Sequence, residues 1–434
     1  MLLVYTHKIT PRLNYIFKQI FVRIIQIPID FTTSIEAFVA HNGPKMSYTN
    51  KPLGSEFHIR SHQLLFDQGI NDLEINVFDW EGIPCFFATG KSSAIPFDLF
   101  AASFYLISRY EEYLPYVQDA HERFSAEDSL AYKFKFLERP LVDIWAFKFL
   151  ESIKEKFPDY TYSSRTFEFV PTFDIDNVYA YKHKGIIRNT GGFFRDILRF
   201  QFPNLLERIL VLLRVRKDPY DTYQFILNQT KKYNLKTIFF FLIGDYTTYD
   251  TNVSSTNSNY KSLIKSIADY VDVGLHPSYF TMTNTKKLKT EKSRLESIVN
   301  RPITKSRQHY LRIKMPDTYQ NLIDLDITED HSMGYANRYG FRASTCTPFY
   351  FYDLDFEIQT PLKVVPFAVM DGTLNYYLKL VPAVSKVRIC QMIDEVKNVN
   401  GKFVLLFHNE TLSETDVWKG WRKLFRDVLK YVYD

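Results

Sequence analysis

Val170-Pro171-Thr172-Phe173-Asp174-Ile175-Asp176 is the stretch around which the chain can be interpreted. Its apolar and aromatic start is typical of a half-buried strand, and it ends in two carboxylates two residues apart. Two aspartates that converge where a strand becomes a loop repel each other unless a cation, a proton or a hydrogen-bond donor lies between them. Because active sites collect at the carboxyl ends of parallel strands, the stretch predicts a site there. The alternative is an Asx-type turn followed by a helix N-cap at Asp176 or Asn177.

Further strand-like runs also end in ionisable side chains, and helix-like segments separate them. These runs cover residues 272–279, 306–312 and 403–409. Alternation of strands and helices favours a parallel sheet that closes, or nearly closes, into a barrel. Four strand ends that carry Asp or His are typical of a metal hydrolase built on a (β/α) barrel.

Residues 165–434 resemble the polysaccharide deacetylases, the NodB-homology group also known as carbohydrate esterase family 4. Thr172 to Asp176 is similar to the first motif of that family in its Asp-x-Asp form. The run around His276 resembles the second motif, and Leu406 to His408 resembles the closing Leu-x-His motif. The resemblance implies an α/β fold with a deacetylase-type (β/α) barrel, complete or lacking part of its wall. It also implies a carbohydrate substrate.

The resemblance further assigns roles to individual residues. Asp174 would be the catalytic base, and Arg307 would pair with it and keep its pKa low. Asp176 and His276 would be metal ligands, and His408 would be the acid that protonates the leaving amine. A site of Asp and His ligands suits Zn²⁺, with nickel and cobalt as alternatives.

One position departs from the family pattern. The second motif usually holds another histidine four residues after the first, and here Phe280 occupies that position. We expect His309 to provide the third metal ligand, because it is the one histidine at a nearby strand end in this region. Ser278 or an additional water is the alternative ligand, and a solvent-facing or aromatic-packed His309 is the structural alternative.

The carboxylate that supports the acid is open between two candidates. Asp330 is the first choice to keep His408 protonated, and Asp371 is the second. His331 and Asn409 are expected to line the same cleft.

Residues 1–164 resemble an uncharacterised N-terminal domain that precedes some bacterial deacetylases. Ser108 to Tyr113 is its most recognisable string, and we expect a smaller α/β or α+β domain. The charged residues Arg109, Glu111 and Glu112 are interpreted as a surface helix end. The polar segment Pro158 to Ser164 is the predicted linker to the domain at 165–434.

Composition limits the class of protein. With 434 residues the chain is too long for one typical core, and a hydrophobic content of 46% with 24% charged residues indicates a globular protein. Aromatic residues make up 17%, which mildly favours a carbohydrate ligand. The net charge of +5 includes no long basic block, so nucleic-acid binding is not expected. Oligomeric state cannot be deduced.

Other features bear on location. Three widely separated cysteines argue against a disulfide scaffold and for a reducing compartment. The N-terminus lacks the pattern of a signal peptide, and Ile20 to Ile29 is too polar for a membrane span. A cytoplasmic protein is therefore expected. The basic, aromatic insertion from Tyr179 to Val215 is long for a βα loop and is predicted to form a lid.

The sequence thus predicts a metal-dependent hydrolase that removes an N-acetyl or related acyl group from an amino sugar or glycan, as in surface-polysaccharide synthesis. The alternative from another class is a catalytically silent glycan-binding or scaffolding module, and Phe280 is its best support. A hydrolase that acts on phosphoesters or other amides at the same metal is a third possibility.

Overall fold

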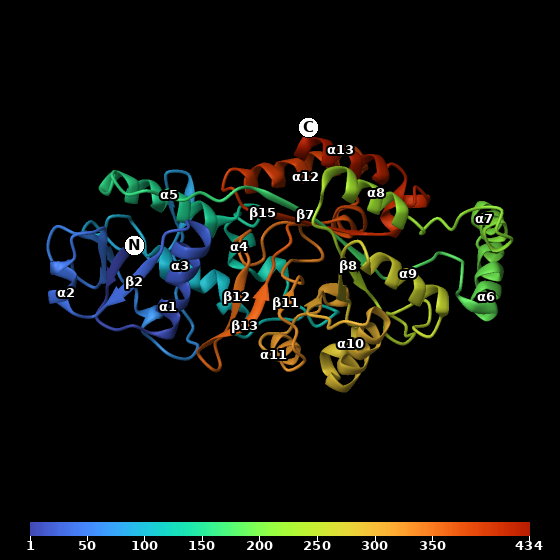
Figure 1. Ribbon diagram of the computed structural model, residues 1–434, viewed down its shortest axis with the longest axis horizontal. Helices are drawn as coiled ribbons and strands as arrows, with labels where there is room; N and C mark the ends of the chain where they lie inside the picture. Colours follow the sequence, from blue (N-terminus) through green and yellow to red (C-terminus); the bar gives the residue numbers. More distant parts are fainter.

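Two sheets organise the chain, and the computed structural model describes residues 1–434. The smaller sheet has the order β2-β1-β3-β4, and all its strand pairs are parallel. Its strands are β1 (Leu2–Tyr5), β2 (Ile29–Thr32), β3 (Lys45–Thr49) and β4 (Phe57–Arg60). This region therefore has α/β architecture, and it lies to one side of the larger sheet (Figure 1).

The larger sheet has nine strands in the order β12-β13-β11-β10-β9-β8-β7-β15-β14, and it curls like part of a barrel. Only the pair β12 and β13 is antiparallel. The strands are β7 (Glu168–Ile175), β8 (Ile238–Phe241), β9 (Asp272–Leu275), β10 (Lys305–Ser306), β11 (Glu329–Asp330), β12 (Phe349–Asp353), β13 (Ile358–Val364), β14 (Val369–Met370) and β15 (Lys402–His408). Because β12 and β14 are edges, the sheet does not close, and the barrel is incomplete.

Helices cover both regions. Those of the N-terminal region are α1 (Pro11–Phe17), which continues as a π-helical segment (Lys18–Ile24), α2 (Ile35–Ala40), α3 (Leu99–Ile107), α4 (Leu130–Lys133) and α5 (Leu141–Lys156). Those of the C-terminal region are α6 (Gly185–Leu198), α7 (Phe202–Leu212), α8 (Tyr223–Tyr233), α9 (Ser258–Ala268), α10 (Thr285–Val299), α11 (Asp317–Ile323), α12 (Pro382–Lys397) and α13 (Trp421–Tyr433). Most alternate with the strands, as the sequence predicts.

Local chemistry explains where several elements begin and end. Asp98 caps α3 by accepting hydrogen bonds from the backbone of Phe100 and Ala101. Helix α13 begins at Trp421, after Gly420 in a left-handed conformation. A short separate hairpin pairs β5 (Phe78–Trp80) with β6 (Ile83–Cys85).

The hydrophobic core does not stop between the two regions. One cluster of 99 buried residues contains side chains from both sheets and their helices. The chain crosses from α5 to β7 through the segment where the boundary between 164 and 165 is predicted. That boundary stays a prediction, because the two regions share their core.

Buried ion pairs also join the regions. Glu112 receives hydrogen bonds from Arg109 and from Arg342, and all three side chains are buried. Burial alone would raise the pKa of Glu112, but the two guanidinium groups hold it at about 2. The expected surface helix end is therefore wrong, because Arg342, 230 residues away, supplies a second counter-charge that permits burial.

Candidate metal and acid–base site

The site lies at the carboxyl end of the central strands of the large sheet. β7 runs between β8 and β15, and Asp174 stands level with Phe240 on one neighbour and His408 on the other. Because the strands are parallel, their carboxyl ends share one edge. The two aspartates at the end of β7 therefore lie beside the other strand ends that carry ionisable groups.

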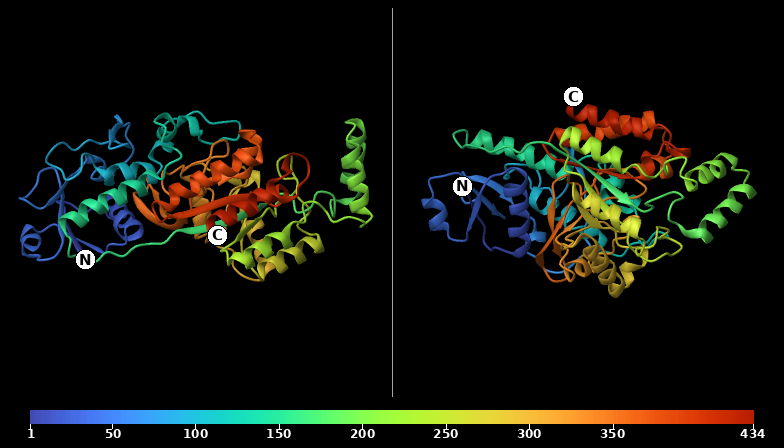
Figure 2. Two further views of the ribbon diagram at one scale, coloured as in Figure 1. Left: turned by 90° about the horizontal axis from the view of Figure 1, so that it is seen from above. Right: turned by 45° about the vertical axis from the view of Figure 1, so that its right-hand side comes forward.

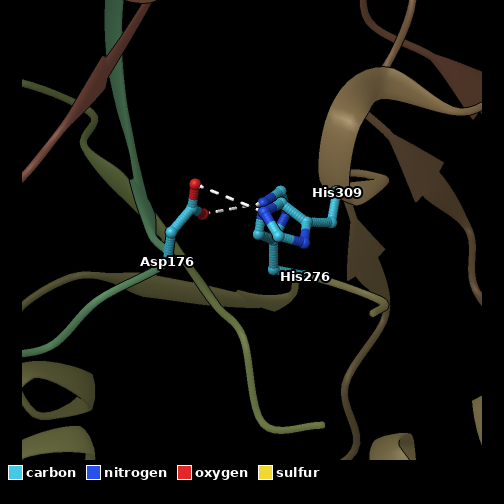
Figure 3. Close-up of side chains that lie close together, drawn as sticks. All are labelled: Asp176, His276 and His309. Carbon is cyan, nitrogen blue, oxygen red and sulfur yellow. Dashed lines mark ion pairs between the residues drawn. The ribbon is translucent and has the colours of Figure 1, made fainter. Parts of the chain in front are cut away.

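Asp176, His276 and His309 converge as the sequence analysis expects (Figure 3). One potential ligand atom from each residue lies within 4.8 Å of those of the other two. The Nε2 atom of His276 is 3.1 Å from Asp176 Oδ1, and the Nε2 atom of His309 is 3.4 Å from Asp176 Oδ2. Two imidazoles and a carboxylate in this arrangement are a donor set that zinc accepts.

The other nitrogen of each imidazole is fixed by an acceptor. His276 Nδ1 lies 2.5 Å from the carbonyl oxygen of Arg307, and His309 Nδ1 lies 2.8 Å from Asp250 Oδ1. A carbonyl or carboxylate oxygen only accepts hydrogen bonds, so both Nδ1 atoms carry the proton. In its neutral form each ring presents the lone pair of Nε2 to the cluster, and the partners orient the rings as is common for metal-binding histidines. No sequence signal marks Asp250, because it belongs to an irregular polar loop far from any motif.

Two observations show that the residues fit a cation. Asp176 Oδ1 is buried and has no hydrogen-bond partner, although buried carboxylate oxygens are usually satisfied. Burial alone would raise the pKa of Asp176, but the imidazoles of His309 and His408 hold it well below its ordinary value. Burial would lower the pKa of His309, but Asp176 and Asp250 raise it to about 9. The cluster therefore favours a positive charge, which a divalent cation supplies as well as a proton does.

Asp174 lies beside the cluster and is held by Arg307. The Nη1 atom of Arg307 donates to Asp174 Oδ1 at 2.9 Å and to Thr172 Oγ1 at 2.8 Å. The Nε atom of Arg307 donates to the carbonyl oxygen of His331 at 3.0 Å, and the arginine is fully buried. The other oxygen of Asp174 lies 3.9 Å from His276 Nε2. Asp174 thus has one oxygen fixed by a cation and the other directed toward the cluster.

His408 approaches from the opposite side, and Asp371 supports it. His408 Nδ1 lies 2.7 Å from Asp371 Oδ1, while His408 Nε2 lies 3.6 Å from Asp176 Oδ2. Burial would lower the pKa of His408, but Asp371 and then Asp176 raise it well above its ordinary value. Expecting Asp330 as the partner is therefore wrong. Asp330 is occupied by Ser306 and Ser332.

A cavity of about 230 Å³ opens between these groups. Its lining joins the cluster to aromatic side chains and to one residue of the N-terminal region: Arg123, Asp174, Asp176, His276, Gln308, His309, Tyr310, Leu311, Ala336, Met370, Gly372, Tyr376, Tyr377, His408 and Glu410. Burial raises the pKa of Glu410 to about 7. Arg123 donates to the carbonyl oxygen of Tyr310 at 2.8 Å, so the N-terminal region contributes to the rim. Neither residue carries a sequence signal that marks it.

Several predicted neighbours of the site lie elsewhere. Phe280 is 42% exposed and packs against Tyr249, and Ser278 donates its hydroxyl to Glu291. Phe280 therefore leaves no gap in the cluster, because His309 enters from the 3-10 turn that follows β10, and the alternative ligand Ser278 is otherwise engaged.

The expected cleft residues His331 and Asn409 are also placed differently. His331 pairs with Glu329 and lines a second cavity among the strand beginnings. Asn409 holds the backbone of Asn177 and Tyr220. Neither residue lines the cavity beside Asp176, His276 and His309.

The insertion predicted as a lid forms α6 and α7. These helices make a hairpin that projects from the body of the molecule (Figure 2). None of its residues lines the cavity. In this structure it does not cover the site.

A family model matches the N-terminal part of the chain. Residues 2–158 match a family described as "Family of unknown function (DUF7033)". No curated protein matches the sequence significantly. No helix of the structure has the length and apolar character needed to cross a membrane.

Among solved structures, a putative polysaccharide deacetylase from Mycobacterium smegmatis is 14% identical, with a TM-score of 0.40, covering 62% of this chain and 85% of that one. The polysaccharide deacetylase of Bacillus cereus is 13% identical, with a TM-score of 0.30, covering 61% and 86%. A CE4 family pseudoenzyme from Bacillus anthracis is 11% identical, with a TM-score of 0.31, covering 63% and 64%. Because these TM-scores are below 0.5, the functional proposal depends on the site itself.

Proposed function

We propose that the protein is a metal-dependent hydrolase that removes an N-acetyl or related acyl group from an amino sugar or glycan. The observation that carries the proposal is the convergence of three elements on one cavity. They are the ligand set of Asp176, His276 and His309, the Arg307-bound Asp174, and the Asp371-bound His408. Zn²⁺ is the proposed metal, because the donor set leaves coordination positions open for substrate.

A divalent metal held by Asp176, His276 and His309 would polarise the acyl carbonyl and favour attack by water near neutral pH. The residues of the chain move the protons. Asp174 accepts a proton from the attacking water, and Arg307 holds its carboxylate in position for this transfer. His408 donates a proton from Nε2 to the departing nitrogen, and Asp371 keeps that imidazole protonated and oriented. The carbon–oxygen bond forms, the carbon–nitrogen bond breaks, and the products are a carboxylic acid and a free amine.

Two features support an amino-sugar substrate. Tyr310, Tyr376 and Tyr377 line the cavity, and aromatic rings pack against the apolar faces of sugars while their hydroxyl groups bind polar substituents. The cavity volume of about 230 Å³ gives room for an acyl group beside the cluster. A role in surface-polysaccharide synthesis remains part of the proposal and depends on which sugar is accepted.

Elemental analysis of the purified protein, followed by acetate-release assays on acetylated nucleotide sugars and short glycans, tests the proposal. One equivalent of metal and acetate release that chelation abolishes are the expected results. A protein that holds metal but releases phosphate from phosphoesters would instead be a hydrolase of another class. A protein that holds no metal and releases no acetate, but binds glycans, would be a silent binding module.

A further inference from the structure

The hairpin of α6 and α7 exposes an unusual amount of apolar surface. Its most exposed apolar side chains are Ile186 at 86%, Ile187 at 88%, Leu198 at 78% and Phe200 at 79%. Further exposed side chains from the same hairpin are Phe194, Phe202, Leu206, Ile209, Leu212, Leu213 and Val215. Exposed apolar side chains gathered on one hairpin mark an interaction site.

The two helices pack against each other through polar groups. Arg208 of α7 donates to Asp196 of α6 at 2.7 and 3.1 Å and to Asn189 at 3.3 Å. Gly192 permits this approach, because a Cβ atom there would lie 2.6 Å from the guanidinium nitrogens of Arg208. Polar side chains therefore hold the two helices together, and the apolar side chains of the hairpin stay exposed to a binding partner. The hairpin also carries a groove with a mostly apolar lining, which includes Ile186, Phe193, Phe194 and Leu212.

Charge decides which occupant fits this surface. Residues 179–217 contain nine Lys and Arg against two Asp and Glu, a net charge of +7, whereas the whole chain carries +5. The rest of the chain is therefore net acidic, and the positive charge is concentrated on the hairpin. Arg199, Arg214 and Arg216 are exposed and form no ion pair.

We propose that this hairpin docks the protein on an anionic lipid bilayer, with its apolar side chains in the interfacial layer and its arginines against the headgroups. Amphipathic helices with a basic polar face and exposed Phe and Leu bind membrane surfaces in this way. A symmetric dimer through the hairpin fits less well, because it would place the same +7 segment against itself. The hairpin projects from the body, so it can reach a flat surface without steric obstruction (Figures 1 and 2).

Docking would also orient the site. Strand β7 ends at Ile175 and α6 begins at Gly185, and Arg188 of α6 donates to the carbonyl oxygens of Thr251 and Asn252. The hairpin therefore has its base on the same side of the sheet as the metal cluster. A membrane-bound protein would hold the site near the headgroups. The docking itself requires no catalytic activity.

Flotation with vesicles tests the proposal on the full-length protein. We expect the wild type to float with vesicles of phosphatidylcholine and phosphatidylglycerol, and to float less with phosphatidylcholine alone or at high salt. Replacing Arg199 and Arg214 by Gln should lower partitioning about 30-fold, which corresponds to about 1 kcal/mol per basic residue. The triple variant Ile187→Ser, Leu198→Ser and Phe200→Ser should abolish flotation.

A matched control separates the hairpin from exposed apolar residues in general. The change Phe356→Ser removes a side chain that is 67% exposed elsewhere, and it should leave flotation unchanged. Far-ultraviolet circular dichroism should be the same for all variants, because the changed side chains are exposed. Wild type that stays with the soluble fraction in both lipid mixtures would overturn the proposal. Sedimentation equilibrium that shows a dimer, lost in the triple variant, would replace the bilayer with a second copy of the chain.

Discussion

Asp143 and Asp176 are two aspartates whose carboxylate oxygens have different surroundings. Both oxygens of Asp143 are occupied, by Arg165 at 2.8 Å, Thr345 at 2.6 Å, the backbone of Cys346 at 3.0 Å and the hydroxyl of Thr347. Asp176 keeps one buried oxygen without a partner. A carboxylate whose donors all belong to the chain stabilises the fold, whereas one that retains a free acceptor is prepared for a ligand.

The same contrast applies to the arginines. Arg342 spends its charge on Glu112 and fixes the junction between the two regions. Arg307 binds only one oxygen of Asp174. The second oxygen of that aspartate lies 3.9 Å from His276 Nε2. Burial alone therefore does not separate structural from functional charges. Between Asp143 and Asp176, the buried oxygen without a partner does.

The largest effect is expected from Asp174→Asn. The amide keeps the shape of the side chain but cannot accept the proton, so turnover should fall by about 10²–10⁴-fold. Metal content should stay at the wild-type value, because Asp174 is not one of the three proposed ligands. Acetate release and elemental analysis measure the two quantities, and Asp355→Asn on an exposed loop is the control. Normal turnover in Asp174→Asn would show that the proposed base is wrong.

Asp143→Ala should have the next largest effect, and it should act on stability. Loss of this carboxylate leaves the largely buried guanidinium group of Arg165 without a counter-charge, which costs about 3–5 kcal/mol of unfolding free energy. Urea denaturation measures this cost. Asp176→Ala in the metal-free protein should destabilise much less, because Asp176 receives few donors, while it should remove the metal. Equal destabilisation by the two changes would contradict the comparison.

Asp371→Asn should have a smaller effect on activity. Asp371 raises the pKa of His408 above its ordinary value, and the amide would remove that charge. His408 must be protonated to act as the acid, so activity is lost as the pH rises through its pKa. The variant should therefore lose activity at lower pH than the wild type, with a decrease of about 10–100-fold at neutral pH. Asp330→Asn should not move the alkaline limb of the pH profile, because Asp330 contacts two serines instead.

How far the sequence predicts the site depends on how local each signal is. Asp174, Asp176, His276 and His408 follow strand patterns directly, and the structure brings all four to one edge of the sheet. Their placement follows from parallel strands, which is a property that periodicity can indicate.

Partners that come from irregular segments were not predictable in the same way. Asp250 lies in a polar loop, and Arg123 belongs to the other region of the chain. The choice between Asp330 and Asp371 depends on which of two strand ends faces His408, and spacing along the sequence does not contain that information. The burial of Glu112 required knowledge of Arg342, which is distant in sequence.

The smallest effect is expected from Phe280→His, which introduces the histidine that the deacetylase motif has at this position. Phe280 is 42% exposed, packs against Tyr249 and lines no part of the cavity. Because His309 already provides the third donor, the new histidine should change neither metal stoichiometry nor turnover, and stability should stay within about 0.5 kcal/mol. His309→Ala should instead lower metal occupancy as much as His276→Ala does. If Phe280→His restored metal to the His309→Ala protein, the second motif could still reach the cluster. If His309→Ala kept its metal without that change, the third ligand would be a different residue, and the free oxygen of Asp176 would have to be satisfied from another side.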